Sequence, residues 1–482
     1  MLVLAIAACA VVASGLPARA QESTLIYSES GGFITLEGET LVRVSGLKGT
    51  IAVRTGKDGE LRYEVRSLDK RREERPIGLW LGGRGFEIAP LDETSEERLL
   101  LEMAVPPGLA VELELEDSNI QIAGLRSDLV LTGARLDVDA RGIYGNLTVE
   151  VVESDLKFDG VAGAVDIDSE AVELVVVRIE GSLGLRLLES KADIRGVTGQ
   201  ADVDTENTVL IMSDVEAGLV LQAAGGRVEM SGVKPRADLT LDGASLILMG
   251  SVGQALIESD SEVQVGNAKG PVVITGYGGP IVGKTLEGAV EIIADQASVE
   301  LEDVKGKLTI SGNDLGVMIK NVAAAATIRT ESSEVRAEGI GGPLQIHNAF
   351  GPVEVRGAKD DVKVVNQDAD VLLAEMAGSV EVFATGDSIE VGWSEFPNEG
   401  HHAITNERGG IVVNLPGGTR CRIEAQSKYG DISSDIATVR VNDDGKFASG
   451  VVGGGRGPTI QIRAHGDVLI SGAAVTEKAP TE

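Results

Sequence analysis

Aliphatic residues recur along this chain at intervals of 18, from Ile120 to Ile389. The anchor column of this repeat comprises Ile120, Val138, Leu156, Leu174, Ala192, Leu210, Val228 and Leu246, and after one interval of 17 it continues with Val263, Ile281, Val299, Val317, Val335, Val353, Val371 and Ile389. Each unit of a repeat array buries its apolar side chains only against its neighbours, so a fixed period determines the architecture. The pattern predicts stacked, equivalent coils.

The same period organises the residues inside one coil. With the anchor as position 0, apolar residues recur at positions 0, 2, 5, 9 and 11. Position 11 is aliphatic in every repeat: Leu131, Val149, Ile167, Leu185, Val203, Leu221, Leu239, Ile257, Ile274, Ile292, Ile310, Ile328, Ile346, Val364 and Val382. Positions 0 and 2 alternate with polar residues, as do 9 and 11, which is typical of strands with one buried face. Each coil therefore offers two short strands, and position 5 fills the corner after a frequent glycine at position 4.

The single 17-residue interval follows Leu246. Ala255 and Ile257 still occupy positions 9 and 11, so the missing residue is predicted in the turn between Glu258 and Glu262. A deletion inside a strand would instead move its buried side chains to the opposite face.

These patterns predict an all-β fold, a single-stranded β-solenoid of about fifteen 18-residue coils with irregular β caps at both ends. The expected organisation is a signal peptide at 1–20, an N-terminal β region and cap at 21–118, the β-solenoid at 119–394, a C-terminal β region and cap at 395–476, and a disordered tail at 477–482. Irregular flanks are expected because the open ends of a β-stack are templates for aggregation.

The first 20 residues have the pattern of a secretory signal. An apolar run over 2–13 is followed by Pro17 and the small residues Ala18 and Ala20, which favours cleavage before Gln21. A lipoprotein-type box ending at Cys9 is the alternative, but the apolar residues after that cysteine make a lipid anchor the less favoured interpretation. The run is too short to span a bilayer, and no later segment approaches 18 consecutive apolar residues, so we expect no transmembrane span.

Removal of the signal would leave Cys421 as the sole cysteine, so no internal disulfide is expected in the mature chain. Cys421 stands between Arg420 and Arg422 in an alternating stretch. This alternation predicts a buried core residue and not a nucleophile.

The chain is strongly acidic, with 43 basic and 75 acidic side chains and a formal net charge of -32. Nucleic-acid binding requires Lys and Arg to displace counterions, so this balance argues against a nucleic-acid partner. The charge suits the solubility of a long β-array, and binding of divalent cations or of a basic partner is the alternative.

The flanking motifs resemble the bacterial putative-adhesin family of exported β-strand-repeat proteins. The resemblance rests on the stretch 101–115 with its Val105-Pro106-Pro107-Gly108 break, on 412–418, and on Gly454-Gly455 leading through 459–462 to 466–470. It implies a right-handed β-helix and an envelope or surface location, and it implies no catalytic residues. The central array of this chain is more regular and longer than the family pattern.

Outward positions 10 and 12 stack on successive coils and carry the main candidates for a cation or ligand surface. They place Asp166 and Asp168 on one coil, Arg186 on the next, and Asp202 and Asp204 on the one after. Clustered carboxylates could hold Ca²⁺ or form the acidic floor of a polysaccharide-active site. The interposed Arg186 favours a surface salt ladder, and no other cofactor or metal site is expected.

Residues 278–285 match the phosphate-loop pattern GxxxxGKT. That motif works only where a strand leads into the loop and a helix follows. Ile281 and Leu286 occupy core columns of the repeat, and the next coil is again strand, so we interpret the match as chance.

Histidines and aromatic residues offer few further candidates. His347 falls at outward position 12, whereas His401 and His402 lie in a polar segment beside Glu399, where solvated loop residues are expected. Aromatic residues make up 3% of the chain, which argues against a sugar-stacking groove. The local group Trp393, Phe396 and Phe383 is expected to seal the last coil, with a partner-binding patch as the alternative.

Three functions remain open. The favoured hypothesis is a non-enzymatic, exported scaffold or adhesin-like binding module of the periplasm, outer surface or extracellular space. The second is a β-helical polysaccharide-active enzyme that uses the acidic pairs and Arg186. The third is a sensor or regulator of envelope state that binds a protein partner.

Overall fold

A computed structural model describes residues 24–27, 31–68, 77–82, 85–92, 96–454 and 457–472. Every regular element in these ranges is a β-strand, and none of them contains a helix. The chain divides into two compact units, Met1–Gln200 and Ala201–Glu482. The predicted signal peptide and the predicted tail at 477–482 lie outside the described residues.

Unit 1 contains the strands β1 (Thr24–Tyr27), β2 (Gly31–Thr35), β3 (Leu41–Ser45), β4 (Lys48–Thr55), β5 (Glu60–Ser67), β6 (Ile77–Gly82), β7 (Gly85–Pro90), β8 (Arg98–Val105), β9 (Ala110–Glu116), β10 (Ser118–Ala123), β11 (Leu129–Ala134), β12 (Asp137–Ile143), β13 (Leu147–Val152), β14 (Asp155–Val161), β15 (Val165–Glu170), β16 (Glu173–Ile179), β17 (Leu183–Leu188) and β18 (Lys191–Val197).

Unit 2 contains β19 (Ala201–Val215), β20 (Leu219–Ser231), β21 (Arg236–Asp242), β22 (Ser245–Met249), β23 (Gln254–Ser259), β24 (Val263–Gly266), β25 (Val272–Tyr277), β26 (Pro280–Leu286), β27 (Val290–Asp295), β28 (Ser298–Val304), β29 (Leu308–Asn313), β30 (Gly316–Val322), β31 (Ala326–Glu331), β32 (Glu334–Ile340), β33 (Leu344–Ala349), β34 (Val353–Arg356), β35 (Val362–Gln367), β36 (Val371–Met376), β37 (Val380–Ala384), β38 (Ser388–Trp393), β39 (His401–Asn406), β40 (Gly410–Leu415), β41 (Cys421–Ser427), β42 (Ile432–Ser434), β43 (Val439–Val441), β44 (Phe447–Val452), β45 (Thr459–Ala464) and β46 (Val468–Gly472).

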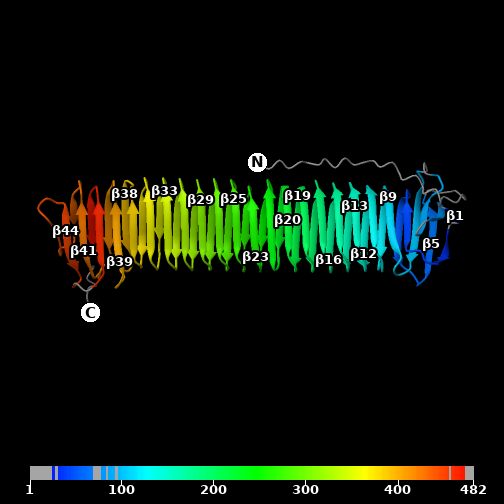
Figure 1. Cartoon of the computed structure of the whole chain (residues 1–482), viewed down its shortest axis with the longest axis horizontal. Helices are drawn as coiled ribbons and strands as arrows, with labels where there is room; N and C mark the ends of the chain where they lie inside the picture. Colours follow the sequence, from blue (N-terminus) through cyan, green and yellow to red (C-terminus); the bar gives the residue numbers. More distant parts are fainter. Residues whose placement is uncertain are drawn as a thin grey trace, which may run out of the picture. The chain divides into compact units, whose positions relative to one another are not determined.

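Within each unit, successive coils stack in parallel with the register that the sequence period predicts (Figure 1). In unit 1, β12 lies between β10 and β14, and Val138 pairs with Ile120 and Leu156. In unit 2, β29 lies between β27 and β31 in the same way. The all-β solenoid is therefore confirmed. The two units together hold about 17 turns, somewhat more than expected, because parallel coils continue into the flanks that lack the 18-residue spacing.

The single slip in the repeat also lies where the sequence places it. Strand β21 still pairs with β23 at an interval of 18, as in Leu241 with Ser259. The next strands pair at an interval of 17, with Leu246 opposite Val263. The missing residue therefore falls in the turn between β23 and β24, and both strands keep their buried faces.

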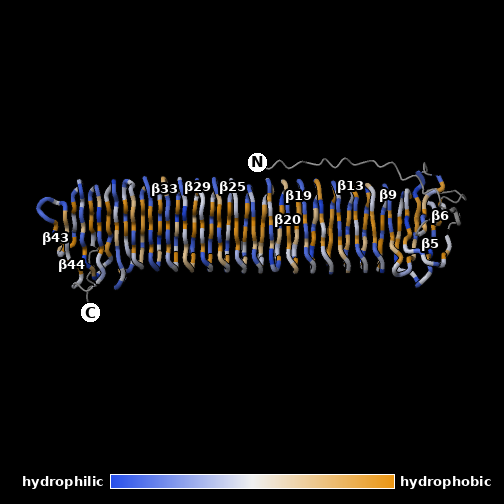
Figure 2. Tube along the Cα trace, in the orientation of Figure 1, coloured by the Kyte–Doolittle hydropathy of each residue, from blue (hydrophilic) through white to orange (hydrophobic). Residues whose placement is uncertain are grey.

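The aliphatic columns form the core of each unit. Every residue at positions 0 and 11 of the repeat is at most 3% exposed. Apolar and polar residues alternate along the strands, as the banding along the chain shows (Figure 2). Full burial of one Leu, Ile or Val side chain contributes about 1.5–3 kcal/mol, so each coil is stabilised mainly by the coils that cover it.

Most coils turn through two residues with left-handed backbone conformation, and the sequence pattern revealed one of the two positions. At position 4 the φ angle is positive at Gly142 (69°), but also at Arg178 (60°) and Thr285 (55°). At position 15 it is positive at Glu153 (51°) and Phe350 (63°). Only glycine, and to a lesser extent Asn and Asp, adopts this conformation without steric cost. Bends that carry another residue, such as Thr285, are therefore strained.

A buried serine supports several coils at the second corner. Ser154 is 4% exposed, and its hydroxyl accepts a hydrogen bond from the Leu136 amide at 2.9 Å and donates one to the Val152 carbonyl at 2.7 Å. Ser333 bridges the Leu315 amide and the Glu331 carbonyl in the same way. The hydroxyl thus satisfies backbone groups that the turn removes from the strand ladder.

The N-terminal flank of unit 1 is not stacked in chain order. Strand β3 lies between β7 and β9, and β4 lies between β8 and β10, all in parallel. The coil formed by β3 and β4 is therefore enclosed by coils that come later in the sequence. Antiparallel strands continue outward from the outer coil: β6 and then β1 beside β7, and β5 and then β2 beside β8.

The C-terminal flank of unit 2 repeats this arrangement. The last coil, β45 and β46, lies between β39–β40 and β41–β42, again in parallel. Strand β44 then covers β41 in antiparallel orientation and is itself paired with the three-residue strand β43. Short antiparallel strands thus form both caps, which limits the exposed edge available for aggregation.

Candidate functional site

The predicted acidic residues lie on exposed rows. In unit 1, Asp168 pairs across β15 and β17 with Arg186, and Asp168 Oδ2 lies 3.8 Å from Arg186 Nη1. These side chains are 62% and 74% exposed, so the contact contributes no more than about 1 kcal/mol. Asp166 lies opposite Gly184. The structure thus brings Asp168 to Arg186 as a salt-ladder contact and gives Asp166 no cationic neighbour on that strand.

The other two aspartates, Asp202 and Asp204, lie on β19 in unit 2, opposite Val220 and Gln222 of β20. In the part of the chain that the structure describes, no three His, Cys, Asp or Glu side chains are grouped so that they could hold a metal ion. Calcium binding on this surface stays a prediction.

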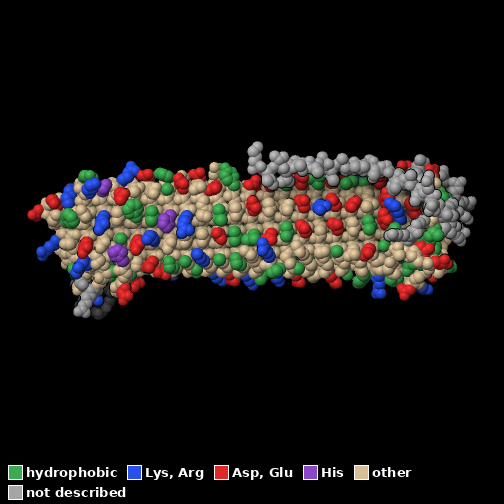
Figure 3. Space-filling model, viewed as in Figure 1, with side chains coloured by type: hydrophobic (Ala, Val, Ile, Leu, Met, Phe, Trp, Pro, Cys, Tyr) green, Lys and Arg blue, Asp and Glu red, His purple; other side chains and the backbone are tan. Residues whose placement is uncertain are grey.

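Charged side chains on both units follow the repeat. Several ion pairs join residues of adjacent coils: Lys191 with Glu173 at 2.8 Å, Lys305 with Glu287 at 2.8 Å, and Lys363 with Glu381 at 3.0 Å. Figure 3 shows acidic and basic side chains interspersed over the visible face of each unit. These exposed ion pairs join neighbouring coils at several different positions of the repeat.

The phosphate-loop match covers the bend at Gly278 and Gly279 and most of strand β26, and strand β27 follows it. Ile281 and Leu286 are buried in the core, and Lys284 Nζ lies 3.1 Å from Glu302 Oε2 on the next coil. The segment lacks the strand-loop-helix geometry that phosphate binding requires, as the column analysis predicts.

The interpretation of His401 and His402 as solvated loop residues is wrong for His402. This residue lies on β39 with its side chain buried, and its Nδ1 accepts a hydrogen bond from the Val380 amide at 3.2 Å. Its Nε2 is buried without a partner. Burial, with a smaller contribution from the charge of His401, lowers the pKa of His402 to about 4. His401 itself is exposed.

The aromatic group at the end of the repeats is built differently from the expectation. Trp393 packs edge to face against Phe396 at 5.2 Å and against His402 at 5.4 Å between ring centroids. Phe383 is 40% exposed and lies outside this cluster. Phe383 occupies position 12 of the repeat on β37, which faces solvent. The third ring of the cluster that covers the last coil is therefore that of His402, and not that of Phe383 as expected from the sequence.

Cys421 is buried in β41, as predicted from its alternating neighbours. Burial raises the pKa of its thiol to about 11. The thiol is therefore protonated at neutral pH and inaccessible to solvent, which is the opposite of a nucleophile's environment.

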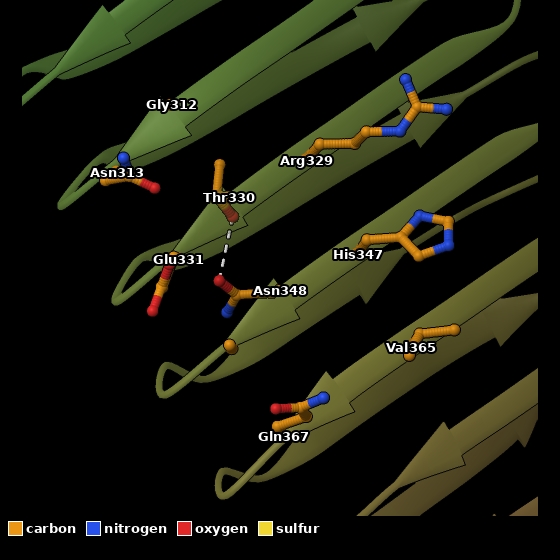
Figure 4. Close-up of a pocket in the computed structure, with 10 residues that line it drawn as sticks. Gly312, Asn313, Arg329, Thr330, Glu331, His347, Asn348, Val365 and Gln367 are labelled. Atoms are coloured by element: carbon orange, nitrogen blue, oxygen red, sulfur yellow. Dashed lines mark hydrogen bonds between the residues drawn. The ribbon is translucent and has the colours of Figure 1, made fainter.

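A surface hollow of about 360 Å³ lies on the outward face of unit 2, where β29, β31, β33 and β35 end (Figure 4). Its lining residues are Gly312, Asn313, Arg329, Thr330, Glu331, His347, Asn348, Ala349, Val365 and Gln367. The sequence analysis named only His347 among them. The signal that would have found the site is the stacking of Arg329 on His347 at position 12, with no acidic residue at the same position of the neighbouring coils.

The floor of the hollow is fixed by small and buried side chains. Gly312 has no room for a side chain, because a Cβ atom would lie 1.5 Å from the Ala294 carbonyl oxygen. Asn348 is 4% exposed and donates hydrogen bonds at 2.8 Å to the carbonyls of Ser333 and Gly351. Thr330 donates its hydroxyl proton to Asn348 Oδ1 at 2.9 Å. These hydrogen bonds within the protein fix the side chains of the floor before any ligand binds.

The comparisons with known proteins identify no family for this chain. No family model matches the chain, and no curated protein matches it. Among solved structures, the chain is similar to a putative cell adhesion protein from Clostridium sporogenes, with 7% sequence identity over 94% of this chain and 98% of that one, and a TM-score of 0.13. None of the described segments is a helix long and apolar enough to cross a membrane.

Proposed function

We propose that this chain is a non-enzymatic, exported β-solenoid that acts as a scaffold or adhesin-like binding surface of the cell envelope. The observation that carries the proposal is the pairing of exposed charged side chains between adjacent coils, where Lys191, Lys305 and Lys363 each contact a carboxylate one coil away. A regular, exposed surface of this kind can contact a long partner at many equivalent points.

The two side chains whose pKa values are shifted most by burial also support a non-catalytic surface. Active sites usually place groups with shifted pKa values in an accessible cleft. In this chain burial shifts the pKa values of His402 and Cys421, and both side chains are fully buried in the core. Neither group can reach a substrate.

The export component of the proposal rests on the N-terminal sequence, with its apolar run and its small residues before Gln21. The resemblance of the flanking turn motifs to putative adhesins is consistent with it. The destination is the periplasm, the outer surface or the medium, and the partner is an envelope protein or polysaccharide.

A fractionation and binding experiment tests this proposal. The full-length chain, produced in a bacterium, is expected to lose residues 1–20 and to leave the cytoplasm. The purified chain is expected to sediment saturably with envelope fragments, whereas an unrelated globular protein of similar negative charge is not. Retention in the cytoplasm without cleavage, or sedimentation that is equal for both proteins, would contradict the proposal.

A further inference from the structure

One side of the hollow on unit 2 carries a guanidinium without an ion pair beside an imidazole. Arg329 on β31 and His347 on β33 are paired in register, and in the part of the chain that the structure describes Arg329 forms no ion pair. His347 Nδ1 is buried without a partner, which leaves Nε2 as the ring nitrogen that can meet a ligand. In a chain of net charge -32, an arginine without a carboxylate partner is available to an anionic ligand.

The opposite side of the hollow is polar. Asn313 and Gln367 are exposed, and among the described residues their side-chain amides have no hydrogen-bond partner. Thr330 keeps its oxygen lone pairs free because its proton goes to Asn348. Glu331 lies on this side too, directed away from Arg329 (Figure 4). Amides, a hydroxyl and a carboxylate offer donors and acceptors at short spacing, which suits a ligand with many hydroxyl groups.

Two features of the backbone argue against a peptide as the ligand. Strands β31 and β33 are paired on both sides, so an extended peptide cannot add to them by main-chain hydrogen bonds. The apolar lining is restricted to Val365 and Ala349 at the hollow, so it has no pocket for a peptide's apolar anchor. The exposed ring of Phe383, which follows Val365 in the same row, adds one stacking surface beside the hollow.

We propose that this hollow binds a saccharide unit that bears a carboxylate, with Arg329 and His347 at the carboxylate and Asn313, Thr330 and Gln367 at the hydroxyls. The inference rests on the proposed function as a binding surface and names the ligand class of one site on it. The guanidinium supplies the fork that matches a carboxylate in two hydrogen bonds.

The test uses the purified full chain, oligogalacturonate as the probe, and calorimetric titration at about 0.15 M ionic strength, where charges beyond about 8 Å are screened. Arg329→Gln is expected to weaken binding at least tenfold. The matched control is Arg336→Gln, which removes the same charge from β32, where Arg336 is paired with Glu334 and Glu354. That variant is expected to bind within twofold of the unaltered chain, and circular dichroism checks that both fold.

The remaining arms separate the alternatives. The methyl ester of the same oligosaccharide is expected to bind at least tenfold more weakly than the acid. Equal binding of acid and ester, equal losses in the two arginine variants, or binding of poly-glutamate with the same dependence on Arg329 would overturn the inference. Absence of binding would also overturn it but leaves the scaffold proposal standing, whereas the appearance of new reducing ends would overturn the scaffold proposal itself.

Discussion

Ile462, in the last coil of the chain, pairs in parallel with Ile404 on β39, although the whole of β40 to β44 separates them in sequence. On its other side Ile462 pairs with Ala425 of β41. The C-terminal coil is thus held between two coils that precede it, and it cannot leave the stack until β41 and β42 have left. The coil of β3 and β4 is enclosed in the same way in unit 1.

This enclosure predicts slow exchange near the C-terminus. Chain ends usually fray and exchange their amide hydrogens first. We expect the amides of β45 and β46 to exchange no faster than those of β39 and β40, and more slowly than those of β43. Hydrogen exchange followed by mass spectrometry measures this order, and faster exchange in β45 than in β43 would contradict the strand order described above.

The core columns predict that replacing two isoleucines of adjacent coils by aspartate has very different effects on stability. Ile310 is 0% exposed at position 11, whereas Ile293 is 46% exposed at position 12. Ile310→Asp buries an unpaired charge and is expected to lower the free energy of unfolding by several kcal/mol. Ile293→Asp is expected to change it by no more than about 0.5 kcal/mol. Urea denaturation of both variants measures this difference. Similar losses of unfolding free energy in the two variants would show that the buried columns are misassigned.

The sequence predicted the fold correctly wherever a coil packs against the coils next to it in sequence. In a solenoid each buried side chain meets residues one period away, so columns such as that of Ile310 can be derived from spacing alone. The stacking order at the ends could not be, because β3 and β45 pair with strands distant in sequence. The burial of His402 was missed because its polar neighbours resemble a loop. The hollow depends on the absence of a side chain at Gly312 beside residues from three further strands.

The left-handed bends predict a stabilising substitution. Thr285 adopts a φ angle of 55°, which crowds its β-branched side chain, while Asn267 and Asn321 occupy the same position of nearby coils. Thr285→Asn is expected to raise the free energy of unfolding by about 0.5–1 kcal/mol. The control Thr275→Asn, at an exposed position of strand β25, is expected to be neutral or destabilising because Asn disfavours strands. A gain at Thr275 that equals the gain at Thr285 would refute the strain argument.

The buried imidazole of His402, beside Trp393, predicts that the chain loses stability in acid. The pKa of His402 is about 4 in the folded chain and about 6.5 when unfolded, because burial disfavours the charged imidazolium, with a smaller contribution from the charge of His401. The unfolded state therefore binds more protons between these values, so stability rises with pH there. About 3 kcal/mol should be lost as pH falls from 6.5 to 4, and the loss is complete below pH 4.

Denaturation at several pH values measures this dependence. His402→Phe removes the titrating group and is expected to flatten the stability curve between pH 6.5 and 4, whatever its effect at neutral pH. His401→Gln, at the exposed neighbour, should leave the slope nearly unchanged. If the His402→Phe chain keeps the full slope, other groups cause the acid sensitivity.

The absence of catalysis is the central claim, and a turnover assay tests it most directly. The purified chain is incubated with polygalacturonate and Ca²⁺, and new reducing ends are measured over time for the unaltered chain and for Asp168→Ala. We predict no reducing ends above the protein-free control with either protein. Turnover by the unaltered chain that is abolished in Asp168→Ala would contradict the account and would assign the acidic row of unit 1 to a polysaccharide-active enzyme.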